Sequence, residues 1–204
     1  VLASGADLLD AARLANVAAG IVVGKTGTAV AEASEIIESL QRQNLLSSSA
    51  LKILTLKAAQ AQVSRWRKRG ERIGFTNGCF DLIHPGHVAI LAKSRAACDR
   101  LVVGLNLDAS VKRLKGKSRP VQNETSRASV LASLASVDLV VLFAEDTPVK
   151  LIEALKPDVL AKGADYAVED VVGAEFVQSY GGKILLVDLE EGQSTTDTIE
   201  RMNQ

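Results

Sequence analysis

After residue 70 the chain alternates short apolar runs with longer segments in which apolar residues recur at helical spacing. The runs that predict strands are residues 72–76, 100–106, 139–143, 159–161 and 183–187. The segments that predict helices are residues 86–97, 124–135, 148–155, 169–180 and 196–202. Each helix returns the chain to the same end of the sheet, so consecutive strands run parallel. We therefore expect an α/β fold, a Rossmann-like parallel sheet with helices on both faces.

The first 70 residues predict helices only. Apolar residues at helical spacing cover residues 7–20 and 29–40, whereas residues 41–49 are polar and rich in serine, which is typical of a linker or a helix start. A third helix is predicted over residues 50–69, with Ser49 as its N-cap. The expected divisions are a helical part (1–40), a linker with a helix (41–70) and the α/β part (71–204).

Composition excludes several classes of function. The 24 basic and 24 acidic residues cancel to a formal net charge of zero, so the chain has no overall positive field for nucleic acid. Apolar stretches such as residues 17–24 fall far short of the roughly 20 residues that a membrane-spanning helix needs. Two cysteines are too few for a disulfide framework and no signal peptide is evident, so we expect a cytoplasmic location. Because the chain begins with Val1, we also expect it to be a piece of a longer polypeptide.

The only two histidines of the chain lie three positions apart, directly after the first predicted strand. Pro85 suits the first turn of a helix, and Gly86 lets the backbone come close to a ligand. His87 then falls in the first helical turn, where free N–H groups and the helix dipole attract phosphate. One histidine alone would more often be a surface or packed core residue. The pair, His84 and His87, predicts an anion-binding site.

Metal binding and cysteine catalysis are the alternative interpretations of this segment. No third ligand of the usual kind lies near the histidines, and their spacing differs from the H-E-x-x-H zinc motif. Cys79 has no evident base and orienting acid, so buried packing is favoured over a nucleophilic role. We therefore expect no protein-bound metal.

Five motifs together resemble the His-x-Gly-His nucleotidyltransferases, a family that includes cytidylyltransferases and the pantetheine-phosphate and heptose-phosphate adenylyltransferases. The motifs, in order, are Asn77-Gly78-Cys79-Phe80-Asp81, His84-Pro85-Gly86-His87, Val103-Gly104-Leu105-Asn106-Leu107-Asp108, Gly163-Ala164-Asp165-Tyr166 and Gly192-Gln193-Ser194-Thr195-Thr196. The resemblance covers about residues 71–202. It implies an in-line attack of a substrate phosphate oxygen on the α-phosphorus of a nucleoside triphosphate, with no covalent enzyme intermediate. Catalysis would then consist of positioning and charge stabilisation.

The resemblance also implies roles for individual residues. The implied catalytic residues are His84, His87, Lys115 and Lys117. The implied substrate-binding residues are Asn106 and Asp108. The implied nucleotide-binding residues are Thr76, Asn77, Gly78, Cys79, Phe80, Asp81, Gly86, Arg127, Gly163, Asp165, Tyr166, Ser194, Thr195 and Thr196. Mg²⁺ would enter as the counterion of ATP.

Some of these residues also have a plainer structural interpretation. The basic loop at residues 112–120 resembles many solvated loops, and this alternative stays open for Lys115 and Lys117. Asp81 is expected to brace its own loop through hydrogen bonds rather than enter the chemistry. Residues 194–196 are also ordinary helix-capping residues.

Residues 1–40 resemble the C-terminal end of a ribokinase-type sugar kinase. They lack the Gly-Ala-Gly-Asp motif that supplies the catalytic base of such kinases, so we expect no kinase activity. A kinase end ahead of a His-x-Gly-His domain is the arrangement of the bifunctional heptose 7-phosphate kinase/heptose 1-phosphate adenylyltransferases. This resemblance implies that ATP reacts with D-glycero-β-D-manno-heptose 1-phosphate to give ADP-heptose and pyrophosphate for lipopolysaccharide core synthesis. It also implies a homo-oligomer.

Two other functions stay open at this point. A cytidylyltransferase acting on a small alcohol phosphate, such as glycerol 3-phosphate, shares the motifs. Close cytidylyltransferase relatives, however, carry an arginine where this chain has Leu189, three residues before the glycine of the Ser-Thr-Thr motif. The other possibility is an inactive fragment whose helices serve only in assembly, which folding without ATP binding would favour.

Overall fold

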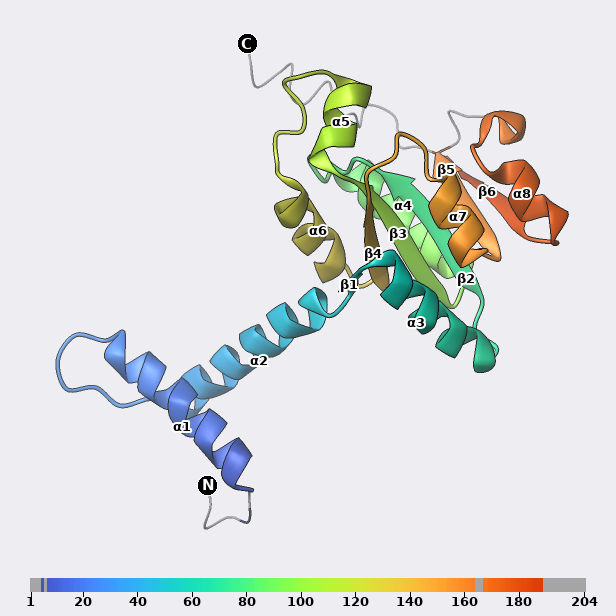
Figure 1. Cartoon of the computed structure of the whole chain (residues 1–204). Coiled ribbons are helices and arrows are strands. Elements are labelled where there is room, and N and C mark those ends of the chain that lie inside the picture. The colour runs from blue at the N-terminus through green and yellow to red at the C-terminus, as the bar shows by residue number, and fades with distance from the viewer. Residues whose placement is uncertain (1–4, 6, 164–166, 189–204) are drawn as a thin grey trace. The chain divides into compact units, whose positions relative to one another are not determined.

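The computed structural model of the chain describes residues 5, 7–163 and 167–188, apart from the side chains of residues 41–48. Contacts between residues divide the chain into two compact units, Val1–Ser48 and Ser49–Gln204. Figure 1 labels the elements of both units. Among the described residues, no helix combines the length and the apolar character needed to cross a membrane.

The first unit consists of α1 (Leu8–Val23) and most of α2 (Ala33–Ala50). A lysine orders the loop between these helices. Lys25 Nζ donates a hydrogen bond to the carbonyl of Val30 at 2.9 Å and forms an ion pair with Glu35 at 2.6 Å. The sugar-kinase origin of residues 1–40 stays a prediction.

The second unit is built on a six-stranded parallel sheet with the strand order β1-β4-β3-β2-β5-β6. Its strands are β1 (Ile53–Leu54), β2 (Ile73–Gly78), β3 (Arg100–Asn106), β4 (Leu139–Phe143), β5 (Val159–Gly163) and β6 (Lys183–Val187). Its helices are α3 (Leu56–Lys68), α4 (Pro85–Ala96), α5 (Asp108–Lys115), α6 (Glu124–Ser133), α7 (Val149–Leu155), the 3-10 helix η2 (Val168–Asp170) and α8 (Ala174–Ser179). The predicted α/β fold with a parallel sheet is confirmed.

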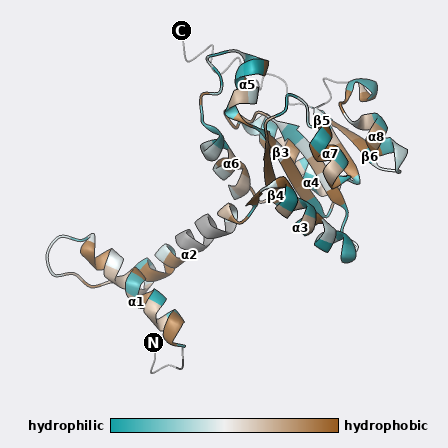
Figure 2. Cartoon of the chain, in the orientation of Figure 1, coloured by the Kyte–Doolittle hydropathy of each residue, from teal (hydrophilic) through white to brown (hydrophobic). Residues whose placement is uncertain are grey.

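Helices cover both faces of the sheet because successive residues of a strand point to opposite sides. On β3, Val102 packs into a core with residues of α3, α7 and α8, whereas Leu101 and Val103 pack with α4 and α6 on the other face. Strands that are buried on both faces are apolar along their whole length. Figure 2 accordingly shows β3 and β4 as largely hydrophobic.

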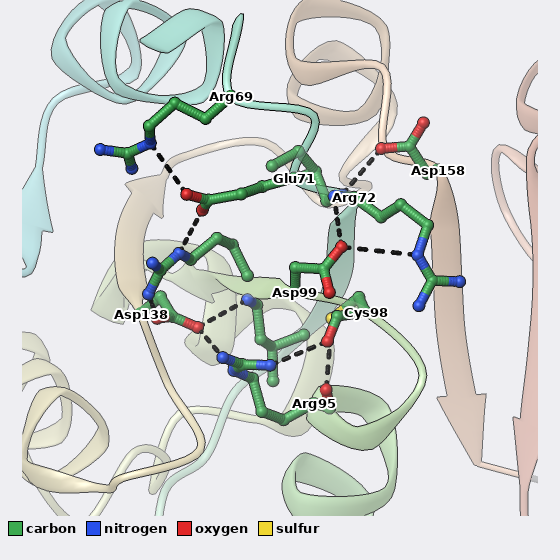
Figure 3. Close-up of polar contacts among 11 residues, drawn as sticks. Arg69, Glu71, Arg72, Arg95, Cys98, Asp99, Asp138 and Asp158 are labelled. Carbon is green, nitrogen blue, oxygen red and sulfur yellow. Dashed lines mark hydrogen bonds and ion pairs between the residues drawn. The ribbon is translucent and has the colours of Figure 1, made fainter. Parts of the chain in front are cut away.

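Three aspartates hold the amino ends of the central strands together (Figure 3). Each stands directly before a strand and accepts a backbone N–H from the start of the neighbouring strand. The bonds join Asp99 to Arg72 (2.8 Å), Asp138 to Leu101 (2.9 Å) and Asp158 to Ile73 (2.7 Å). The hydrogen bond from the Arg72 backbone, helped by its guanidinium, keeps the pKa of Asp99 below its ordinary value. Asp138 also forms ion pairs with Arg95 at 2.9 Å and Arg100 at 3.1 Å.

Replacing Asp138 with alanine is expected to lower the free energy of unfolding by about 1–3 kcal/mol, because the Leu101 N–H loses its acceptor in a half-buried position. Urea unfolding measures this change. Asp146→Ala is the matched control, since the Asp146–Arg113 pair is about half exposed on both sides. Such a surface pair contributes no more than about 1 kcal/mol. Equal losses in the two variants would show that Asp138 does not hold the strand starts.

The segment before the sheet differs from the prediction. Residues 41–49 form the second half of α2 rather than a linker. The predicted helix over residues 50–69 is wrong at its start, because β1 precedes it and α3 begins at Leu56. Its N-cap is Thr55 rather than Ser49, and the Thr55 hydroxyl accepts the N–H of Ala58 at 3.3 Å. A two-residue strand has no periodicity of its own, and only its pairing with β4 defines it.

Two further helical segments differ from the sequence interpretation. Residues 108–115 form α5, so the basic segment predicted as a loop begins inside a helix. The predicted helix at residues 169–180 is divided into η2 and α8, because Gly173 between them has a φ of 90°. The predicted helix at residues 196–202 lies outside the described residues.

The winding of the sheet reverses at β2, which has β3 on one side and β5 on the other. Ligands of such sheets bind beyond the carboxyl ends of the strands, at the point where the strand order reverses. The segment that follows β2 here contains both histidines. The fold therefore predicts that a ligand binds near this loop and near the residues that follow β3.

Candidate active site

The loop after β2 carries an unusual backbone conformation. β2 ends at Gly78, where a Cβ atom would lie 3.1 Å from the Phe80 ring, so the glycine makes room for this side chain. Phe80 has a φ of 44°, in the left-handed region that a bulky residue adopts at a cost of about 1–3 kcal/mol. Such a conformation persists only where the surrounding contacts fix it.

His84 and His87 face each other at the start of α4. His84 is the N-cap residue and Pro85 occupies the first turn, as the sequence predicts. The imidazole centroids are 3.8 Å apart, and the Phe80 ring lies 5.2 Å from the ring of His87. Within the described part of the chain, Nδ1 of each histidine is buried without a hydrogen-bond partner. Two buried ring nitrogens without partners are typical of a site that is completed by a ligand.

The surroundings disfavour the charged form of both imidazoles. Desolvation lowers the pKa of His84, and desolvation together with repulsion from His84 lowers the pKa of His87 to about 4. A hydrogen bond with the backbone of Leu82 opposes the shift at His87. At pH 7 the free chain therefore holds a neutral His87, which can form hydrogen bonds to a ligand and gains a proton readily only beside an anion.

Asp81, the residue after Phe80, anchors the loop that follows β2. The Asp81 side chain is 1% exposed. It accepts hydrogen bonds from Arg119 Nε at 2.5 Å, from the Val121 N–H at 2.8 Å and from the Gln122 N–H at 3.1 Å. This confirms the prediction that Asp81 braces its loop. A contact between Asp81 and the nucleotide stays a prediction.

Arg127 anchors the same loop at Cys79, the residue before Phe80. Its side chain has no exposed surface, and all three guanidinium nitrogens donate to protein atoms. Nη1 donates to the carbonyl of Cys79 at 2.5 Å, Nη2 to Asp108 Oδ1 at 2.6 Å and Nε to the carbonyl of Gln122 at 3.0 Å. The predicted contact between Arg127 and the nucleotide stays a prediction.

The end of β3 lies beside this loop and carries the two residues predicted to bind the acceptor substrate. Asn106 Nδ2 donates to Ser110 Oγ at 3.0 Å, and the backbone N–H of Asp108 donates to Glu124 Oε2 at 2.9 Å. Leu107, between them, lines a cavity of about 280 Å³ at the carboxyl end of β4. Their role in substrate binding stays a prediction.

The basic residues of the segment 112–120 differ in whether they form ion pairs. Arg113 pairs with Asp146 at 2.6 Å, and Arg119 pairs with Asp81. Lys115 and Lys117 are exposed, and in the described part of the chain no ion pair engages either of them. These two lysines, predicted as catalytic, therefore remain available to an anion, whereas the two arginines are neutralised by aspartates.

Cys79 shows no sign of activation. Its thiol is partly buried, and burial raises the pKa of the thiol despite the opposing charge of Lys115. A protonated thiol is a poor nucleophile, which agrees with the packing role that the sequence favours. Thr76 and Gly86 are buried beside the loop, and Gly163 ends β5. Asn77, at the end of β2, has a buried Oδ1 without a partner in the described part of the chain.

The remaining predicted residues cannot be placed from the structure. The set that lies outside the described residues consists of Asp165, Tyr166, Ser194, Thr195 and Thr196. Across residues 5, 7–163 and 167–188, no group of three histidine, cysteine, aspartate or glutamate side chains comes together as a metal site.

Sequence reasoning missed the function of Arg119. This arginine stands out in the sequence only as one of several basic residues of the segment 112–120. Nothing in its spacing indicates that it meets Asp81, which lies 38 residues earlier. The available signal is an aspartate in the loop three residues after the end of β2, which indicates a partner without identifying it.

A parallel sheet that carries a pair of adjacent histidines at its reversal point is the arrangement expected of a nucleotidyltransferase domain. The sequence profile of the cytidylyltransferase-like family matches residues 75–201. The chain belongs to this family.

Curated relatives extend the similarity over nearly the whole chain. The chain is 64% identical over 202 residues to the bifunctional protein HldE of Paramagnetospirillum magneticum. This alignment covers 99% of this chain and 41% of that protein. It is 61% identical over 202 residues to the bifunctional protein HldE of Caulobacter sp., with the same coverage. The chain thus spans about two fifths of the length of these relatives.

Two solved structures share the fold. A lipopolysaccharide core biosynthesis protein from Thermoplasma volcanium is 25% identical, has a TM-score of 0.50, and aligns over 61% of this chain and 100% of its own. The pantoate-beta-alanine ligase of Francisella tularensis, solved with a form of ATP and beta-alanine, is 18% identical with a TM-score of 0.53. It aligns over 74% of this chain and 76% of its own, and at this identity it shows the fold alone.

Proposed function

We propose that this chain transfers the adenylyl group of ATP to D-glycero-β-D-manno-heptose 1-phosphate, giving ADP-heptose and pyrophosphate for lipopolysaccharide core synthesis. The observation that carries the proposal is the pair of half-buried imidazoles at the reversal point of a nucleotidyltransferase sheet, whose buried Nδ1 atoms have no partner among the described residues.

The choice of substrate is supported by similarity along the chain. Relatives with 64% and 61% identity are named bifunctional protein HldE, and this chain matches about two fifths of their length, as expected for one of two activities. The resemblance of residues 1–40 to a sugar kinase and of residues 77–87 to heptose-phosphate adenylyltransferases indicates the same substrate. The solved relative from Thermoplasma volcanium carries a name from lipopolysaccharide core biosynthesis.

In the proposed reaction an oxygen of the sugar phosphate attacks the α-phosphorus of ATP. A new oxygen–phosphorus bond forms, the bond between the α-phosphorus and the bridging oxygen breaks, and pyrophosphate leaves with that oxygen. His84 and His87 would donate hydrogen bonds to phosphate oxygens as negative charge shifts onto them. Lys115 and Lys117 would balance the charge of the leaving pyrophosphate. No covalent bond to the protein is needed.

Mg²⁺ belongs to the proposal only as the counterion of ATP. The described residues form no cluster of metal ligands, so they do not fit a protein-held metal, and the triphosphate oxygens would supply the ligands instead. A homo-oligomer and a cytoplasmic location are likewise parts of the proposal.

The test is an assay of pyrophosphate release with purified chain, ATP and heptose 1-phosphate, with ADP-heptose identified by mass spectrometry. Parallel reactions replace the acceptor with glucose 1-phosphate or glycerol 3-phosphate. The proposal requires pyrophosphate and ADP-heptose in equal amounts, and faster turnover with the heptose. Folded chain that binds ATP but forms no ADP-heptose would overturn it.

Binding of ATP is expected to raise the pKa of His87 from about 4, because the triphosphate stabilises the imidazolium. At about pH 5.5 the free chain holds His87 mostly neutral, so ATP binding takes up protons. Calorimetry in two buffers of different ionisation enthalpy measures this uptake. His87→Ala is the control that subtracts protons taken up by ATP itself. The same uptake in variant and wild type would place the triphosphate away from His87.

A further inference from the structure

We infer that Arg127 is a positioning residue: by joining the backbone after β2 to Asp108 after β3, it holds Phe80 in the conformation that sets His87 in place. Only the kinetic test of this inference depends on the proposed function. It gives Arg127 a role other than the direct nucleotide contact that the sequence predicts.

The first step of the argument is the burial of the arginine. The Arg127 side chain is 0% exposed, whereas the carboxylate of its partner Asp108 is 29% exposed. A guanidinium with no exposed surface, and with protein partners on each of its three nitrogens, has no free face for a ligand. Its fork geometry instead suits the bridging of two acceptors on different segments.

The second step leads from Arg127 to Phe80. The Cys79 carbonyl that accepts from Nη1 belongs to the peptide group preceding Phe80, and the orientation of that group sets φ of Phe80. The value of 44° is strained for phenylalanine and needs an external contact to persist. On the other side of Phe80, the Asp81 carboxylate is anchored by Arg119 and by two backbone N–H groups. Phe80 is thus held from both sides.

The third step leads from Phe80 to the histidines. The Phe80 ring packs against His87 at 5.2 Å, and His87 lies against His84 at 3.8 Å. If the Cys79 peptide rotates, Phe80 relaxes, and the imidazole of His87 loses one wall of its pocket. Displacements of about 1 Å near reacting groups cost up to 10²-fold in rate.

The chain contains a matched control for this arrangement. Arg95 Nη1 donates to the carbonyl of Cys98 at 2.8 Å and its Nε pairs with Asp138 at 2.9 Å, as shown in Figure 3. The partners of Arg95 are therefore of the same kinds as those of Arg127, a cysteine carbonyl and an aspartate. Arg95 lies at the amino ends of the strands, away from the histidines. Arg95→Met should affect stability without affecting the site.

The kinetic test compares Arg127→Met, Arg127→Lys and Arg95→Met with the wild type. We expect Arg127→Met to lower kcat about 10-fold to 50-fold, with the Kd for ATP changed less than about 3-fold. Arg127→Lys keeps the charge but not the fork, so it should fold and recover only part of kcat. Arg95→Met should keep kcat. A rise in the Kd for ATP that matches the fall in kcat would make Arg127 a nucleotide ligand and overturn the inference.

A second readout needs neither substrate nor activity. The chain has two histidines, so an NMR titration of histidine-labelled protein shows two imidazole signals. In Arg127→Met, and to a smaller extent in Arg127→Lys, the pKa of His87 should rise from about 4 toward its ordinary value as the ring becomes hydrated. In Arg95→Met it should not change. An unchanged His87 titration in Arg127→Lys with reduced kcat would also overturn the inference. If the wild type forms no ADP-heptose, the proposed function fails while this titration still tests the positioning role.

Discussion

Replacing His84 or His87 with alanine is expected to lower kcat on the order of 10²-fold or more, with a much smaller effect on ATP binding. The reason is that both imidazoles would donate hydrogen bonds to oxygens whose negative charge grows in the transition state. Their Nδ1 atoms are buried and have no partner among the described residues, which leaves them available to a ligand. Steady-state kinetics and a separate measurement of the Kd for ATP give the two quantities.

Val88→Ala is the matched control for the histidine variants. Val88 follows His87 on the same helix, and it is 43% exposed, so its truncation changes α4 without touching the histidine pair. It should keep kcat close to that of the wild type. If a histidine variant also keeps its turnover, that histidine is structural, and the charge-stabilising role assigned to it is wrong.

ATP is expected to exceed CTP by roughly 10²-fold or more in kcat/KM, with heptose 1-phosphate as the common acceptor. A site that forms hydrogen bonds to the edge of one base leaves buried polar groups unpaired when the other base binds. We expect ATP because residues 77–87 resemble heptose-phosphate adenylyltransferases and because Leu189 departs from the cytidylyltransferase pattern. Position 189 lies outside the described residues, so this expectation rests on the sequence.

The comparison of nucleotides uses one preparation of enzyme and one assay of pyrophosphate release. Saturating acceptor is held constant while each nucleotide is varied, so the ratio of kcat/KM values reports the base alone. The Val88→Ala variant should give the same ratio, because Val88 is exposed and is not among the residues predicted to bind the nucleotide. Equal rates, or faster turnover with CTP, would indicate a cytidylyltransferase and leave the fold and the histidine roles intact.

The strands show how far the sequence defines the fold. The predicted ranges 100–106, 139–143 and 183–187 coincide with β3, β4 and β6. For β3 and β4 the reason is burial on both faces, which requires an apolar residue at nearly every position and leaves a continuous signal. β1 gave no such signal, because two residues are too few for any period. It is a strand only because Ile53 and Leu54 pair with β4.

Some features of the site could likewise be predicted from local sequence, whereas others depend on contacts between distant residues. The histidine pair, its place at a helix start and the bracing role of Asp81 could all be inferred from local sequence, because they depend on neighbours within a few positions. The partners of Asp81 and Arg127 could not be inferred. Arg119 lies 38 residues from Asp81, and Arg127 lies 48 residues from Cys79. Spacing within a motif carries no information about such distant contacts.

The sequence by itself determined the parallel α/β sheet, the position of the histidine pair after β2 and the family to which the chain belongs. Apolar periodicity and short motifs record these features locally. Only the tertiary structure decided which charges are neutralised, how Phe80 is held and why the pKa of His87 falls to about 4. Those properties depend on desolvation and on the summed fields of groups brought together by folding, so they exist only once the chain is packed.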